Sequence, residues 1–191
     1  IRKIVISSGV VTTIAGTETF STPAGITTDG ANLYVSEFSG GKIRKIVISS
    51  EEVSTLVAST LISSPFSITT DNTNLYVTDF NNKKIFKIVI SSSQVSVLAG
   101  PTEFNGIYGI TTDGTNLYAV DYLAKKIFKI VISSGQVSVL AGPTGFTGPF
   151  GIGTDGTNLY VADYSASKIV KVVISSRQVS VLAGPTGFTG P

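Results

Sequence analysis

The sequence lacks cysteine, histidine, methionine and tryptophan, and charged residues fill only 14% of its 191 positions. Without cysteine the chain has no disulfide, no thiol nucleophile and no thiolate metal ligand. Without histidine it also lacks the usual general base and the commonest transition-metal ligand. These absences exclude much of enzyme chemistry, and we expect neither a metal site nor a cofactor.

Long apolar runs are missing as well. The longest, such as residues 46–48, are strand-sized and soon reach serines, whereas a membrane-spanning helix needs roughly 20 apolar residues. We therefore expect no membrane span. The sequence opens at Ile1 without a leader segment, so any targeting signal would lie outside it. The composition favours an extracellular, cell-surface or periplasmic bacterial protein, although a cytosolic protein could have the same composition.

The residues that are abundant point to strands. Apolar residues make up 42% of the chain, enough for a folded core in a chain of this length. Valine, isoleucine, serine, threonine and glycine dominate, and these residues favour strands and turns over helix interiors. The composition predicts an all-β protein.

The chain repeats itself every 42 residues. IRKIVISS begins at Ile1 and Ile43, IFKIVISS at Ile85 and Ile127, and IVKVVISS at Ile169. Each of these runs is followed by a VSVLAG-like run, and the complete repeats continue with a Pro/Gly-rich link, a GITTDG-like run and a TNLYVADY-like run. Four apolar runs between turn signals predict four strands per repeat. A repeat of this length is typical of β-propeller blades, since β-helix and leucine-rich solenoids use shorter repeats.

The run GITTDGTNLYVADY followed by KIxKI resembles the NHL repeat, with a glycine-led strand, an Asp-Gly turn, a Leu-Tyr-Val strand and a basic-apolar strand. The resemblance covers essentially the whole chain. It implies blades whose strands run a, b, c and d from the central channel outward, with GITT on a, NLYV on b, KIVI on c and VSVL on d. Where many NHL repeats carry Asn-His-Arg, this chain has FSGGK, FNNKK, YLAKK and YSASK, so the family's ligand contacts do not carry over.

On this alignment residues 1–191 form one NHL-like propeller domain of about four and a half blades. The predicted units are a c–d half blade over 1–23 and full four-stranded antiparallel blades over 24–65, 66–107, 108–149 and 150–191. A closed ring, a larger ring completed by other residues and an open superhelical array all fit this pattern.

Two columns of acidic residues recur with the repeat. The a–b turn carries Asp29, Asp71, Asp113 and Asp155. We expect them to accept turn backbone N–H groups; a calcium ring is disfavoured, because one carboxylate per turn supplies too few oxygens. The end of strand b carries Glu37, Asp79, Asp121 and Asp163. We expect this second column to bond backbone donors of the b–c link or a neighbouring lysine, and catalytic carboxylates are the alternative.

Aromatic and basic columns accompany the acids. We expect the mid-strand tyrosines Tyr34, Tyr76, Tyr118 and Tyr160 to lie in the core, and the aromatic residues after strand b, Phe38, Phe80, Tyr122 and Tyr164, to pack between blades. A basic stripe at the start of strand c contains Lys42, Lys84, Lys126 and Lys168. The stripe is interpreted as solvated and structural, because the net charge is only +2 and the upstream acids offset it.

The d–a and b–c links vary most between repeats, and alternating strand direction brings both to the same face. We expect this face to bind the ligand. Its candidate contact residues are the exposed-looking aromatics Phe20, Phe104 and Phe146, together with Asn81, Asn82 and Tyr108.

The sequence therefore predicts a non-catalytic scaffold or binding module. Its expected partner is a protein, a glycan or further copies of the chain joined through open blade edges. Two alternatives remain: polyanion binding through the basic stripe, which would be salt-sensitive and for which nucleic acid is disfavoured, and a propeller enzyme of the lyase or hydrolase type.

Overall fold

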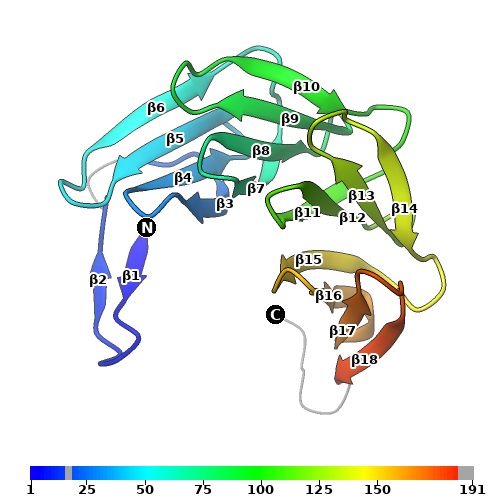
Figure 1. Ribbon diagram of the computed structural model, residues 1–191. Helices are drawn as coiled ribbons and strands as arrows, with labels where there is room; N and C mark the ends of the chain where they lie inside the picture. Colours follow the sequence, from blue (N-terminus) through cyan, green and yellow to red (C-terminus); the bar gives the residue numbers. More distant parts are fainter. Residues whose placement is uncertain (16–18, 185–191) are drawn as a thin grey trace.

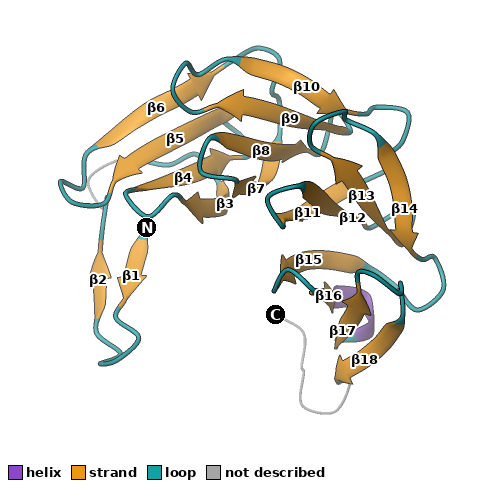
Figure 2. Cartoon of the chain, viewed as in Figure 1, coloured by secondary structure: helices purple, strands orange, loops and turns teal. Residues whose placement is uncertain are grey.

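The computed structural model describes residues 1–15 and 19–184. Within these ranges the chain forms eighteen strands and one three-residue 3₁₀ turn, η1 (Tyr164–Ala166), with no α-helix (Figure 2). None of the helical structure in these ranges is long and apolar enough to cross a membrane.

The strands form four four-stranded antiparallel sheets, which we number as blades 1 to 4, preceded by a two-stranded hairpin. The hairpin contains β1 (Arg2–Ile4) and β2 (Val11–Thr13). Blade 1 contains β3 (Pro23–Thr28), β4 (Asn32–Glu37), β5 (Lys42–Val47) and β6 (Val53–Ala58). Blade 2 contains β7 (Pro65–Thr70), β8 (Asn74–Asp79), β9 (Lys84–Val89) and β10 (Val95–Ala99). Blade 3 contains β11 (Ile107–Thr112), β12 (Asn116–Asp121), β13 (Lys126–Val131) and β14 (Val137–Ala141). Blade 4 contains β15 (Pro149–Thr154), β16 (Asn158–Asp163), β17 (Lys168–Val173) and β18 (Val179–Ala183).

The blades follow one another along an arc (Figure 1). The first strand of each blade lies innermost, where β7 contacts both β3 and β11, and β11 contacts β15. The last strand of each blade lies outermost, and the β1–β2 hairpin and blade 4 occupy the two ends of the arc. This arrangement confirms the all-β propeller architecture.

The side chains of each strand b point alternately toward the preceding and the following blade, because successive side chains of a strand point to opposite faces. In β12, Leu117 and Ala119 join the apolar cluster shared with blade 2, whereas Tyr118 and Val120 join the cluster shared with blade 4. We call the side of a blade that packs on the following blade its forward face, and the opposite side its backward face. Both faces are apolar, so a blade is covered only when it has a neighbour on each side.

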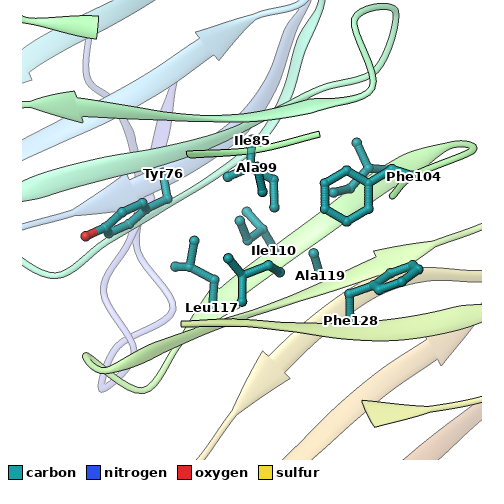
Figure 3. Close-up of a cluster of buried hydrophobic side chains, with 10 residues drawn as sticks. Tyr76, Ile85, Ala99, Phe104, Ile110, Leu117, Ala119 and Phe128 are labelled. Atoms are coloured by element: carbon teal, nitrogen blue, oxygen red, sulfur yellow. The ribbon is translucent and has the colours of Figure 1, made fainter. Parts of the chain in front are cut away.

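Figure 3 shows the interface between blades 2 and 3, where Tyr76, Ile85 and Ala99 of the forward face meet Leu117, Ala119 and Phe128 of the backward face. Burying each large apolar side chain fully contributes about 1.5–3 kcal/mol. The core is therefore a series of blade–blade interfaces.

The innermost strands begin one residue before the predicted units, at Pro23, Pro65, Ile107 and Pro149. Proline has no N–H to donate, so it is tolerated at the first residue of a strand. The end of the predicted 150–191 unit lies outside the described residues, since the structure describes nothing after residue 184.

Candidate functional site

The d–a and b–c links are fastened together by the buried acidic column at the end of strand b. The Asp79 carboxylate accepts hydrogen bonds from the backbone N–H groups of Ser63 at 2.7 Å and Ser64 at 3.3 Å, in the d–a link. It also accepts the backbone N–H of Asn82 at 3.1 Å, in the b–c link. The side chain is fully buried. One carboxylate thus replaces the strand partners that these link donors lack.

The same arrangement recurs in the other blades. Asp121 accepts the N–H groups of Asn105 at 2.6 Å and Gly106 at 3.0 Å. Asp163 accepts those of Thr147 at 2.9 Å and Gly148 at 2.7 Å. The expected backbone role of this column is confirmed, but most of the donors come from the d–a link, which the sequence did not indicate. These carboxylates are committed to holding the loops.

The basic stripe lies directly opposite the acidic column. Antiparallel pairing of strands b and c places Glu37 across from Lys42, Asp79 from Lys84, Asp121 from Lys126 and Asp163 from Lys168. The Lys168 ammonium lies 3.6 Å from the Asp163 carboxylate and donates to the Gly145 carbonyl oxygen at 3.1 Å. Each lysine of the stripe therefore has a carboxylate as its cross-strand neighbour, which offsets its charge locally.

The a–b turns have the structure expected for their aspartates. Asp29 accepts the N–H groups of Ala31 and Asn32 at 2.9 and 2.7 Å and the Tyr34 hydroxyl at 2.8 Å. Partial burial opposes the charged form of Asp29, but the hydrogen bonds from Asn32 and Tyr34 outweigh it and lower the pKa to about 2. Burial and the bond to Asp29 raise the pKa of Tyr34 to about 12. The turn interpretation is confirmed, and the core interpretation is confirmed for Tyr34, Tyr76 and Tyr118, whereas Tyr160 in blade 4 is half-buried.

Three aromatic rings from three different blades meet at the channel. Phe66, Tyr108 and Phe150 each occupy the second position of an innermost strand. The ring centroids of Phe66 and Tyr108 are 5.0 Å apart, those of Tyr108 and Phe150 are 4.8 Å apart, and those of Phe66 and Phe150 are 5.4 Å apart. The contact between blades 2 and 4 shows that the rings converge from across the arc. We call these residues the ring trio.

The aromatic residues after strand b surround the ring trio. Phe38 contacts Phe66 at 6.1 Å and Phe80 contacts Tyr108 at 5.0 Å, each reaching the following blade as expected. Tyr122 and Tyr164 contact the trio residue of their own blade, Tyr108 and Phe150, at 5.6 and 6.0 Å. Together with the ring trio these four residues form what we call the aromatic cluster. It lies at the start of strand a and the end of strand b, on the face that carries the variable links.

The cluster has a hollow of about 540 Å³ lined by Tyr108, Tyr122, Phe150 and Tyr164. Phe150 is 37% and Tyr164 is 52% exposed, so ring surface is open to solvent there. The Tyr122 hydroxyl lies 3.0 Å from the Ser165 hydroxyl. Burial raises the pKa of Tyr108, and neighbouring Tyr122 adds to this rise, so the hydroxyl stays neutral near pH 7. The lining therefore combines apolar ring faces with phenolic hydroxyl groups.

Buried hydroxyls on strand b hold the backbone of two ring-trio residues. Ser36 donates to the Phe66 carbonyl oxygen at 2.8 Å and accepts from the Gly25 N–H at 2.9 Å. Thr78 donates in the same way to the Tyr108 carbonyl oxygen at 2.7 Å. The bonds to the Phe66 and Tyr108 carbonyl oxygens cross from one blade to the next. The start of β7 and of β11 is therefore fixed by the preceding blade as well as by its own sheet.

The expectation that Phe104 and Phe146 are exposed is wrong, since they are only 2% and 6% exposed. Both rings enter blade–blade interfaces, and Phe104 packs edge to face on Phe128 with centroids 5.2 Å apart (Figure 3). A single d–a link can carry one aromatic ring inward and another toward the channel. The links are too short for sequence alone to separate the two directions.

The other predicted contact residues have mixed positions. Phe20 is half-buried against the hairpin–blade 1 cluster, with the Arg44 guanidinium over its ring at 5.4 Å. The Asn81 amide donates to the Ser64 hydroxyl at 2.6 Å, and the Asn82 amide donates to the Leu61 carbonyl oxygen at 3.0 Å. These amides hold the links together. Tyr108 belongs to the aromatic cluster.

The remaining members of the aromatic cluster were not among the predicted contact residues. A usable signal existed, because the second position of strand a holds Ala24, Phe66, Tyr108 and Phe150 in successive repeats. This column is variable and mostly aromatic within an otherwise conserved strand. Within residues 1–15 and 19–184, no group of three or more histidine, cysteine, aspartate or glutamate side chains is placed to hold a metal ion.

Comparison with known proteins supports the fold. No protein-family model matches the sequence, and no curated protein matches it either. Among solved structures, a streptogramin B lyase is similar with 17% identity and a TM-score of 0.74 over 90% of this chain and 58% of the lyase. The virginiamycin B lyase of Staphylococcus aureus is similar with 22% identity and a TM-score of 0.75 over 98% of this chain and 63% of the lyase.

Two further similar structures are not described as lyases. One belongs to a nidogen/laminin complex, with 18% identity and a TM-score of 0.63 over 86% of this chain and 81% of the other. The other is an auxiliary nutrient binding protein of Bacteroides thetaiotaomicron, with 17% identity and a TM-score of 0.70 over 89% of this chain and 44% of the other. This chain spans 58% and 63% of the two lyases, and these likenesses establish its fold as that of a β-propeller.

Proposed function

We propose that the chain is a non-catalytic, extracellular binding module of the NHL type and that its ligand is a neutral glycan held by the aromatic cluster. One observation carries this proposal: the hollow at the channel is lined by four aromatic rings, three of which are tyrosines. The apolar face of a sugar ring packs on an aromatic face, and hydroxyl groups exchange hydrogen bonds with phenols. The shared face of the variable links is thus the binding face.

The chemistry of the surrounding acids supports binding rather than catalysis. Asp121 and Asp163, which immediately precede Tyr122 and Tyr164, are fully buried and accept backbone N–H groups of the loops. A general acid or base must reach the reacting group and exchange a proton with it. Carboxylates enclosed in this way instead serve to position the rings.

The absence of tryptophan simplifies the test, because the emission of the tyrosines is not masked by tryptophan emission. We expect neutral oligosaccharides to change this emission in a saturable titration, with affinity confirmed by calorimetry. Replacing the exposed ring in Tyr164→Ala should weaken binding by about two- to tenfold, since ring contacts contribute about 0.5–1.5 kcal/mol. Recovery of the oligosaccharide unchanged, checked by mass spectrometry, would agree with a non-catalytic role.

The matched control is Leu123→Ala. Leu123 is 62% exposed in the same b–c link as Tyr122 but does not line the hollow, so its loss should leave affinity unchanged. The proposal fails if neutral oligosaccharides do not bind, if Tyr164→Ala binds them as tightly as the original chain, or if they are converted to a product. Saturable binding of an apolar peptide instead, lost in Tyr164→Ala, would assign the cluster to a protein partner.

A further inference from the structure

The forward face of blade 4 is uncovered at positions that are buried elsewhere. Leu182 of β18 is 57% exposed, whereas Leu140 at the same position of blade 3 is 6% exposed. Tyr160 and Ile169 are half-buried, and their counterparts in blade 3, Tyr118 and Ile127, are completely buried. The residue types are the same as, or close to, those of the covered blades. Only the neighbouring blade is different.

The backward face of the β1–β2 hairpin is uncovered in the same way. Ile4 is 63% exposed, but the residues at its repeat position in blades 1 to 3, Ile46, Ile88 and Ile130, are completely buried. Val11 of β2 is 52% exposed, while its counterpart Val53 is half-buried. The hairpin thus presents apolar side chains of the kind that other blades bury against a preceding blade.

These two faces are the two halves of an interface that the chain already forms three times. In each successive pair of blades, the same kind of contact is made by repeat-equivalent residues. Those equivalent to Tyr160, Ile169 and Leu182 lie on the forward face of one blade and pack on those equivalent to Ile4 and Val11 on the backward face of the next. At the ends of the arc each half is present without its complement among the described residues. A second copy of the chain supplies that complement with the same residue types and the same strand spacing.

From this complementarity we propose that copies of this chain associate head to tail, with the forward face of blade 4 packing on the backward face of the β1–β2 hairpin of the next copy. The two surfaces differ from each other, so the interface is heterologous. Each added copy leaves one face of each kind free. Copies therefore add until a ring closes or, where the rotation does not close, as an open array, and the average mass rises with concentration.

A basic residue on the hairpin does not oppose this contact. Arg2 occupies the repeat position of Arg44, and Arg44 already lies at a hairpin–blade interface with its guanidinium over the Phe20 ring. Arg44 also pairs with Glu37 at 3.6 Å within its own blade. An arginine at this position is therefore compatible with one blade packing on another.

The test is light scattering over a range of concentrations on the original chain and two single variants. The original chain should show a mass above 19.9 kDa that rises with concentration. Leu182→Asp places a charge on the apolar forward face of blade 4, and Ile4→Asp places one on the apolar backward face of the hairpin. Each variant alone should stay at the monomer mass. Both side chains are more than half exposed, so neither change disturbs a folded core, as circular dichroism would verify.

Mixing the two variants gives the decisive result. Each retains the face that the other has lost, so an equimolar mixture should form a species of twice the chain mass and nothing larger. The control Val97→Asp alters an exposed valine of blade 2 that lies on neither end of the arc and should associate like the original chain. A monomeric original chain, association that survives either end variant, or a mixture that stays monomeric would each overturn the proposal.

Discussion

The middle of the arc and its two ends contain the same repeat in different surroundings. Ile130 of blade 3 and Ile4 of the hairpin occupy one repeat position, yet the first is completely buried and the second is 63% exposed. The tyrosines of strand b show the same difference, since Tyr118 is enclosed and Tyr160 is half-buried. Burial in this fold is therefore supplied by the neighbouring blade rather than by the blade itself.

This difference makes the molecule behave like other stacked repeats. Each blade has an apolar face on both sides and contributes to stability mainly through the interfaces that it shares. A blade at the end of the arc has only one such interface. The cost of a substitution should consequently depend on where along the arc a repeat position lies, even when the local sequence is unchanged.

The largest expected contrast is between Ile130→Ala and Ile4→Ala. Ile130 lies in the interface between blades 2 and 3, so its truncation leaves a cavity and should lower the free energy of unfolding by about 2–5 kcal/mol. The same change at Ile4, measured at a concentration where the chain is monomeric, removes an exposed side chain and should alter stability by less than about 0.5 kcal/mol. Urea denaturation followed by circular dichroism measures both. Equal costs would show that the exposed end of the arc is covered in solution.

A smaller contrast is expected for a glycine position of strand a. A methyl group added at Gly109 would lie 2.6 Å from the backbone oxygen of Phe150 in the next blade, whereas at Gly151 its nearest neighbour would be the Ala162 side chain at 3.7 Å. Gly109→Ala should therefore destabilise the chain by about 1–3 kcal/mol through overpacking. Gly151→Ala should be near neutral. Ser67 occupies the same repeat position in blade 2, which shows that a Cβ atom can be accommodated there, so we expect a cost in the lower part of that range. Thermal unfolding of the two variants compares them.

The smallest contrast is expected for acid and base titration, because each a–b turn is local to its own blade. The lowered pKa of Asp29 means that this carboxylate stabilises the folded chain above its unfolded value near 4 and loses that contribution as the pH falls toward about 2. Tyr34 has the opposite sign. Its pKa is raised to about 12, so its contribution is complete below about 10 and is lost as the pH rises toward 12.

We therefore expect a flat profile of thermal stability near neutral pH with a fall at each extreme. Replacing Asp71 of blade 2, whose pKa is also lowered, with asparagine should remove part of the stability loss at low pH. The substitution should also lower the free energy of unfolding near neutral pH by about 1–2 kcal/mol, a value reduced for solvent screening. Asp29→Asn in blade 1 is the comparison. A marked difference in the shape of the acid limb between these variants would contradict a locally determined turn.

Features that depend on a single repeat could be predicted from the sequence. The 42-residue period and the apolar runs predicted the four strands of each blade, and the Asp-Gly turns predicted hydrogen bonding by Asp29 and its counterparts. These depend on neighbours a few residues away. The core position of Tyr34, Tyr76 and Tyr118 also followed from the apolar residues around them.

Features that depend on how blades meet could not be predicted in this way. Phe104 and Tyr108 lie four residues apart, yet one is buried between blades 2 and 3 and the other joins the ring trio. The contact between Phe66 and Phe150 joins blades 2 and 4 and depends on the curvature of the arc. No pattern within one repeat determines that curvature.

The buried carboxylate at the end of strand b has a consequence for how this protein can evolve. It holds the loops through backbone N–H groups, which every residue type except proline possesses. Serines at 63 and 64, an asparagine and a glycine at 105 and 106, and a threonine and a glycine at 147 and 148 are all held in this way. The side chains on the face that carries the variable links can therefore differ between repeats while the loop path stays constant, except where a close neighbour leaves no room, as at Gly148, where a Cβ atom would lie 2.7 Å from the Tyr122 ring. Proline at these positions would remove the N–H group that the carboxylate accepts.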